Sequence, residues 1–171
     1  MTEVLRTLTD KVQTLVDRAS QLPIGGADRV AGVFFGGGAG LVLGIAMHLT
    51  PDPHGFGTHR QLGLGACTML QITGWPCPMC GMTTTFTLFA HLRPMDAIAN
   101  QPFGVVLFPV TVGLAVLGAI DAVLGRGALR GALSKVQRNE RAWAGVLLFG
   151  MIGGWLYKCV RMHPEAFHLL G

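Results

Sequence analysis

The segment QLGLGACTMLQITGWPCPMCGMTTTFTLFAHL, residues 61–92, decides the fold of this chain. Its 32 residues include no Asp, Glu, Lys or Arg, and a stretch of that length is long enough to cross a bilayer. Pro76 and Pro78, however, each lack the backbone N–H that a continuous helix needs. Irregular backbone at membrane depth occurs only where protein or water covers its polar groups. The segment is therefore either one span of a four-span protein or a folded loop of a three-span protein.

Composition places the whole chain in a membrane. Of its 171 residues, 50% are hydrophobic and only 13% are charged, and the mean hydropathy is +0.49. A typical soluble domain is about 25% charged. The length suits one domain, so residues 1–171 are expected to form a single membrane domain. The net charge of +4 is small for a nucleic-acid binder, and no nucleic-acid partner is expected.

Three further stretches predict spanning helices, because about 20 consecutive apolar residues cross a bilayer. They are residues 30–49, 102–124 and 142–160. Residues 1–22 carry charge throughout, which excludes the apolar core of a signal peptide. Their apolar residues recur at helical spacing, which predicts an amphipathic helix that lies in the membrane interface or packs on protein.

Four glycines in the first predicted span repeat every four residues: Gly32, Gly36, Gly40 and Gly44. Small residues at this spacing lie near one helical face and allow another helix to approach closely. The pattern predicts a packing face along this span. Its partner is either another helix of this chain or a helix of a second copy.

The distribution of Lys and Arg chooses between three and four spans, because cytoplasmic loops of membrane proteins are enriched in these residues. Three spans place nine of the 13 Lys and Arg residues in the cytoplasm and four outside, whereas four spans place seven and six. Three spans with a cytoplasmic N-terminus are therefore predicted. Residues 61–101 and the C-terminus then lie outside the cytoplasm. The expected fold is an all-α integral membrane protein with three transmembrane helices, an N-terminal amphipathic helix and a re-entrant or interfacial helical loop.

The predicted loop carries the sequence PCPMCG, from Pro76 to Gly81, and a short helix is predicted after it over residues 82–91. Pro78 suits the first turn of that helix. Ten helical residues rise about 15 Å, which is half the thickness of a bilayer. The helix can therefore dip into the membrane or lie on it, but it cannot cross.

This stretch resembles the domain of unknown function 2752 family of small bacterial membrane proteins. Members of that family typically carry Cys-Pro-x-Cys-Gly-x-Thr, often followed by Arg-Ala, and an Asn-Pro about twenty residues later. The matching residues here are Cys77, Pro78, Cys80, Gly81 and Thr83, and Gln101-Pro102 stands where Asn-Pro is usual. The resemblance covers about thirty residues. It implies a bacterial cytoplasmic membrane location and marks the loop as the site, but it supplies no reaction.

One interpretation of the loop is redox chemistry at Cys77 and Cys80. A Cys-x-x-Cys pair at the start of a helix is a common dithiol arrangement, because the helix N-terminus lowers the pKa of a thiol. Outside the cytoplasm a disulfide between the two would persist. Cys67 and Cys159, expected on the same side, would supply a second pair. No strand precedes the motif, which distinguishes it from thioredoxin.

A second interpretation is a metal site, since Cys-x-x-Cys is also the first half of many zinc sites. No second Cys-x-x-Cys and no His-x-x-x-His occurs in the chain. The remaining ligands would therefore be scattered histidines on the same side of the membrane. The candidate set is Cys77, Cys80, His54 and His91.

The third interpretation is structural. Pro76 and Pro78 would set a rigid corner, with the two cysteines as small buried residues or a static disulfide. Gly81 would permit a close backbone approach, and the threonines of residues 83–85 would cap the helix or bond back to its carbonyls.

The sequence favours the structural interpretation and a non-enzymatic membrane protein that acts as an accessory, small-ligand-binding or interaction protein. A membrane thiol-disulfide oxidoreductase and a metal-binding membrane protein are the alternatives. No cofactor is identified. The expected partners are the lipid bilayer and another membrane protein or a second copy, bound through the face from Gly32 to Gly44.

Overall fold

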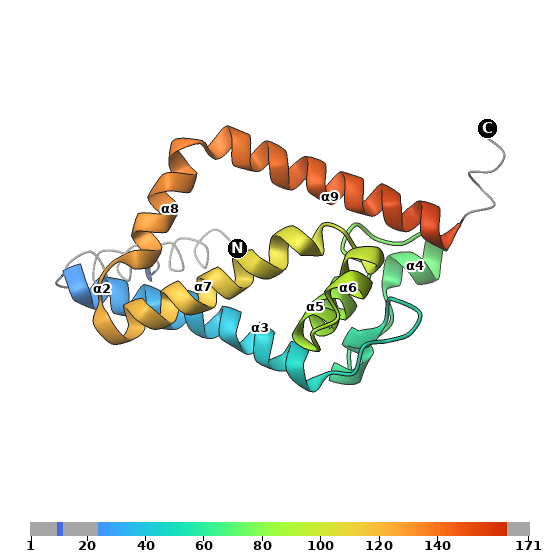
Figure 1. The fold of residues 1–171 in the computed structure, drawn as a ribbon, viewed down its shortest axis with the longest axis horizontal. Helices are drawn as coiled ribbons and strands as arrows, with labels where there is room; N and C mark the ends of the chain where they lie inside the picture. The colour runs from blue at the N-terminus through green and yellow to red at the C-terminus, as the bar shows by residue number, and fades with distance from the viewer. Residues whose placement is uncertain (1–9, 12–23, 164–171) are drawn as a thin grey trace. The chain divides into compact units, whose positions relative to one another are not determined.

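The computed structural model describes residues 10–11 and 24–163, which contain helices and no strand (Figure 1). Three helical stretches are long and apolar enough to cross a membrane: Gly25–His48, Gly104–Leu124 and Glu140–Met162. These findings confirm the prediction of an all-α membrane protein with three spans. The amphipathic helix predicted over residues 1–22 lies outside the described residues, apart from residues 10 and 11.

Residues 61–92 do not form a fourth span. They contain the end of a 3₁₀-helix, η2 (Thr58–Leu62), and two short α-helices, α4 (Thr68–Thr73) and α5 (Met82–Ala90). The longest, α5, has nine residues and rises about 14 Å, too little to cross a bilayer. Another short helix, α6 (Pro94–Asn100), follows α5 and packs beside it (Figure 1). The prolines break the segment as their missing donors predict.

The chain divides into two compact units, and three helices contribute residues to both. The first unit comprises residues 1–38 and 114–135, and its described elements are α2 (Ile24–Ala31), the π-helix η1 (Gly32–Gly36), the end of α7 (Gly104–Leu124) and most of α8 (Ala128–Arg138). The second comprises residues 39–113 and 136–171, with most of α3 (Gly37–His48), the short helices, the start of α7, and α9 (Glu140–Met162). The loop with the cysteine motif lies wholly within the second unit.

In the first unit, Gly32 and Gly36 pack directly on Gly118 of α7. A Cβ atom on Gly36 would lie 2.7 Å from the Gly118 Cα atom, so a larger side chain would separate the helices. Gly40 and Gly44, by contrast, have open space where a Cβ would be. Within the chain, the close packing predicted for the four glycines therefore ends at Gly36, and packing of Gly40 and Gly44 on a second copy stays a prediction.

The π-helix η1 explains this difference. A π-helical turn holds one more residue than an α-helical turn. The residues after it are therefore rotated by about 100° from where an unbroken α-helix would place them. The four-residue repeat predicts one shared face only for an unbroken α-helix. The π-helix rotates Gly40 and Gly44 away from the face on which Gly32 and Gly36 pack.

A buried carboxylate in the first unit fixes the turn between α7 and α8. Asp121 is 1% exposed, and its two carboxylate oxygens accept the backbone N–H groups of Ala128 and Leu129 at 2.7 and 2.8 Å. These are donors at the start of α8 that no residue of that helix can satisfy. Asp28 accepts a hydrogen bond from Arg130 at 2.6 Å and attaches α8 to α2 as well.

Large apolar side chains on the spanning helices remain uncovered within the chain. Phe34, Val123 and Phe149 are 75%, 72% and 77% exposed. Soluble proteins rarely leave extended apolar surface of this kind exposed to water. The exposed side chains fit contact with lipid.

Candidate functional site

The Cys-Pro-x-Cys loop begins where α4 ends at Gly74 and closes in a tight turn before α5. The backbone N–H of Cys80 donates to the Cys77 carbonyl at 2.9 Å. Gly81 follows with φ +84°, a left-handed conformation that glycine adopts without strain. A Cβ on Gly81 would also lie 2.5 Å from the carbonyl oxygen of Gly55. Both the conformation and the space at this position therefore require glycine.

Side chains from distant parts of the sequence hold the backbone carbonyls of this loop. Trp155 Nε1 on α9 donates to the Pro76 carbonyl at 2.7 Å, and Gln101 Nε2 donates to the Pro78 carbonyl at 3.3 Å. We call these two donors, together with Asn100 Nδ2, which donates to the Gly81 carbonyl at 3.1 Å, the carbonyl clamp. Carbonyls removed from water require such partners, so the clamp stabilises irregular backbone among the helices.

The threonines after the motif also bond within the second unit. Thr85 Oγ1 donates to the Gly81 carbonyl at 3.0 Å, as the sequence analysis allowed. The hydroxyl of Thr84 is 2.8 Å from the hydroxyl of Thr58, and both side chains are buried. The α5 helix is therefore tied to the segment that follows the first span, which brings residues 52–58 against the loop.

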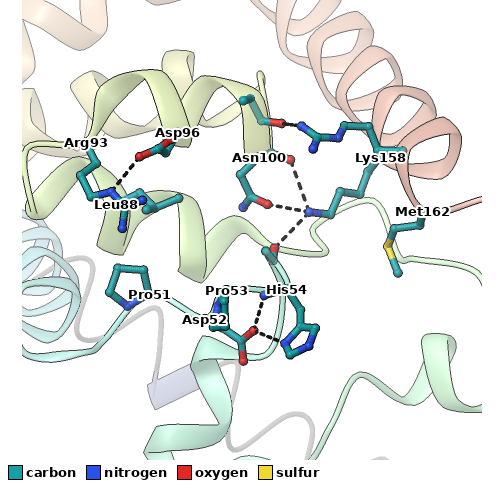
Figure 2. A pocket seen from close by; sticks show the side chains of 13 residues that line it. Pro51, Asp52, Pro53, His54, Leu88, Arg93, Asp96, Asn100, Lys158 and Met162 are labelled. Atoms are coloured by element: carbon teal, nitrogen blue, oxygen red, sulfur yellow. Dashed lines mark hydrogen bonds and ion pairs between the residues drawn. The ribbon is translucent and has the colours of Figure 1, made fainter.

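Lys158 on α9 is a buried cation at the centre of this arrangement. It is 4% exposed, and Nζ donates to Asn100 Oδ1 at 2.7 Å and to the Gly55 and Asn100 carbonyls at 3.0 and 3.4 Å (Figure 2). These three bonds use all the donors of an ammonium group. Within residues 24–163, no carboxylate forms an ion pair with Lys158. A buried charge is normally paired with an opposite charge. Among the described residues, Lys158 instead has the dipoles of the Asn100 side chain and of two backbone carbonyls.

A cavity of about 470 Å³ opens beside Lys158, and we call it the Lys158 pocket (Figure 2). Arg161 lines it one helical turn further along α9, and its Nη1 donates to the Ala99 carbonyl at 2.7 Å. The charged groups that line the pocket also include Arg93 and Asp96, which pair with each other, and Asp52, which accepts the backbone N–H of His54 at 2.8 Å. Lys158 and Arg161 have no carboxylate partner among the described residues, which leaves the pocket with an excess of positive charge.

The cysteines gather differently from the prediction. All four are free thiols, and the thiol of Cys67, at the start of α4, lies close enough to the Cys77 thiol for each to influence the acidity of the other. Cys67 and Cys80 line a second cavity of about 120 Å³. Cys159 is buried on α9, and its thiol interacts with no other cysteine. Cys67 therefore lies beside the motif, and it forms no interaction with Cys159, its expected partner in a second pair.

The three clustered thiols have different acidities. The backbone amide of Leu70 lowers the pKa of Cys67, although partial burial opposes it. Burial raises the pKa of Cys77, and the neighbouring Cys67 raises it further. Burial also raises the pKa of Cys80, to about 11, with the charges of Cys77 and Cys67 as smaller causes and Lys158 opposing them. Cys67 is therefore the thiol that most readily becomes a thiolate.

The structure does not assemble the predicted metal ligands. His54 lines the same cavity as Cys80, but His91 follows the last residue of α5, at the opposite end of that helix from Cys77. Across the described ranges, no three His, Cys, Asp or Glu side chains are grouped to hold a metal ion.

Three residues of the site were not identified from the sequence as its members: Asn100, Trp155 and Lys158. Lys158 carried a usable signal, because an ionisable residue inside an apolar span often marks a functional site. The other two carried none, since their roles depend on contacts between segments up to 79 residues apart.

Residues 67–115 match the family described as protein of unknown function (DUF2752). The match begins at Cys67, covers the loop, α5 and α6, and ends within α7. It confirms the resemblance predicted from PCPMCG. No curated protein and no solved structure matches the chain.

Proposed function

We propose that this protein is a non-enzymatic membrane protein that binds a small ligand with an oxyanion group, phosphate or carboxylate, in the Lys158 pocket. The observation that carries the proposal is the unpaired positive charge there: Lys158 is buried beside a cavity of about 470 Å³, and Arg161 lines the same cavity. Cations whose positions are fixed by other bonds need little reorganisation to receive an anion, which favours binding.

Fixed geometry supports an anion in preference to a cation. Lys158 Nζ is held by Asn100 and Gly55, and the Arg161 guanidinium is held by Ala99. Arginine retains further N–H donors after one bond, and its planar fork matches an oxyanion. The ligand would therefore bond directly to Arg161 and receive long-range stabilisation from the Lys158 charge.

We further propose that the pocket faces the outside of a bacterial cytoplasmic membrane, with the N-terminus in the cytoplasm. The excess of Lys and Arg before the first span and between the second and third spans supports this orientation. The pocket is lined by the connection after the first span and by the end of α9, and three spans place these two on the same side.

The full-length protein in nanodiscs of neutral phosphatidylcholine provides the test. Inorganic phosphate, succinate and, in separate discs, phosphatidylglycerol serve as probes, and thermal unfolding reports binding. A ligand at one hundred times its Kd stabilises the folded state by about 2.7 kcal/mol. We expect at least one probe to stabilise the wild type. A soluble probe would indicate a free ligand, and phosphatidylglycerol alone would indicate a lipid headgroup.

Arg161→Gln is the decisive variant, because Arg161 is exposed and its loss should not prevent folding. We expect it to weaken binding at least tenfold, whereas the control Lys135→Met, which removes an exposed lysine of α8, should bind as the wild type does. Lys158→Met should weaken binding too if it folds. The proposal fails if no probe binds, or if binding is equal in wild type and Arg161→Gln.

A further inference from the structure

The loop contains three cysteines where its sequence motif contains two. Cys67 directly precedes α4, and after that helix the chain returns so that the Cys67 and Cys77 thiols are neighbours. The backbone turn places Cys80 after Cys77, with its side chain buried and 5% of the residue exposed. Cys67 and Cys77 are both partly exposed. Cys67 and Cys77 are therefore neighbouring thiols, and they are the two more exposed members of the cluster.

A cavity of about 120 Å³, which Cys67 and Cys80 line, opens beside the cluster and gives access to Cys67, the more exposed of the two. The polar side chains of His59 and Arg60 also line it, so water and a small polar reagent can enter.

We propose that Cys67 and Cys77 form a reversible disulfide by exchange with a small-molecule disulfide, and that Cys80 remains a thiol. In the first step the Cys67 thiolate attacks one sulfur of the small disulfide. A mixed disulfide forms, and the other sulfur leaves as a thiolate. In the second step Cys77 loses its proton and attacks the Cys67 sulfur, which releases the second small thiolate. Two protein thiols are oxidised, and one small disulfide is reduced to two thiols.

The assignment of Cys67 as the attacking group follows from its environment. The thiolate is the nucleophile in this exchange, and the rate depends on the thiolate fraction and on access. The Leu70 amide lowers the pKa of Cys67, whereas burial raises the pKa of Cys80 to about 11. Cys80 is thus both the least accessible and the least ionised of the three.

The test uses the full chain in native membranes equilibrated with dithiothreitol and its cyclic disulfide at graded ratios. Remaining thiols are then blocked with a maleimide, and mass spectrometry of peptides identifies the disulfide. We expect a peptide that links Cys67 to Cys77. Its ratio to the reduced form should rise tenfold for each tenfold rise in the ratio of oxidised to reduced probe, because both couples transfer two electrons.

Single serine variants separate this pair from the motif pair. Cys67→Ser should abolish the disulfide, and it should fold because serine is a favoured residue before a helix. Cys80→Ser and the control Cys159→Ser should retain it. A Cys77–Cys80 disulfide in the wild type, a disulfide that survives in Cys67→Ser, or thiols that stay reduced at every ratio would each overturn the proposal.

Discussion

At the scale of single residues, Gly81 shows what a sequence motif predicts and what it leaves open. The sequence predicted a close backbone approach at this glycine. The structure adds the partner, the Gly55 carbonyl, and the positive φ of +84°. Neither follows from the motif, because Gly55 lies outside it and reaches the loop only through the tertiary fold.

Alanine substitutions at two glycines separate strain from collision. Gly63 has φ +75° and open space around it, so Gly63→Ala should cost only the left-handed strain, about 1–2 kcal/mol. Gly81→Ala adds a collision with the Gly55 carbonyl oxygen, and overpacking of this kind costs about 1–3 kcal/mol more. Thermal unfolding in detergent measures both. Equal losses in the two variants would show that the close approach contributes nothing.

The cysteines should differ in the pH dependence of their alkylation. Cys67, with its pKa lowered, should react with iodoacetamide fastest at pH 7, because more of it is thiolate. Cys80, with its pKa raised to about 11, should react slowest, and its rate should still rise about tenfold per pH unit between pH 8 and pH 10. Mass spectrometry of reduced wild-type protein resolves each site. A Cys80 rate that levels off below pH 9 would contradict this order.

At the scale of helices, the glycine repeat of the first span shows a limit of periodicity. Gly32 and Gly36 pack on α7, as the repeat implies for a close approach. Beyond them Gly40 and Gly44 meet no other part of the chain, because the π-helix changes the angle between successive residues. Residues 30–49 contain no Pro and no Asp, Glu, Lys or Arg that would mark this irregular turn. The spacing of the glycines alone could therefore not predict it.

Two alanine variants of this span test that difference. Gly36→Ala places a Cβ 2.7 Å from the Gly118 Cα atom, and we expect a loss of about 1–3 kcal/mol in stability. Gly40→Ala meets no atom within 4 Å, and the higher helix propensity of alanine predicts an unchanged or slightly raised stability. The midpoint of unfolding in SDS titrations measures both. If the two variants behave alike, the packing of Gly36 on α7 is refuted.

At the scale of the whole molecule, charge counting and proline positions predicted the fold well. The unequal distribution of Lys and Arg chose three spans, and the prolines located the break in residues 61–92. The pocket could not be predicted in this way. It depends on Lys158, Arg93 and the segment after the first span coming together, and no local pattern encodes the distance between them.

Labelling of intact cells tests the orientation. Leu64→Cys places a thiol at an exposed site after the first span, and Gly131→Cys places one on α8, where a side chain meets no other atom within 4 Å. A maleimide that cannot cross membranes should modify residue 64 and not residue 131, when labelling is read peptide by peptide. The opposite pattern would reverse the proposed topology.

The carbonyl clamp has a consequence for the order in which this protein is made. The Pro76 carbonyl receives its partner from Trp155, which the ribosome adds 79 residues later. Until α9 emerges and inserts, the loop has its prolines and cysteines but lacks this donor. The loop should therefore mature at the end of synthesis. A nascent chain halted before α9 would carry the whole motif in an unfinished form.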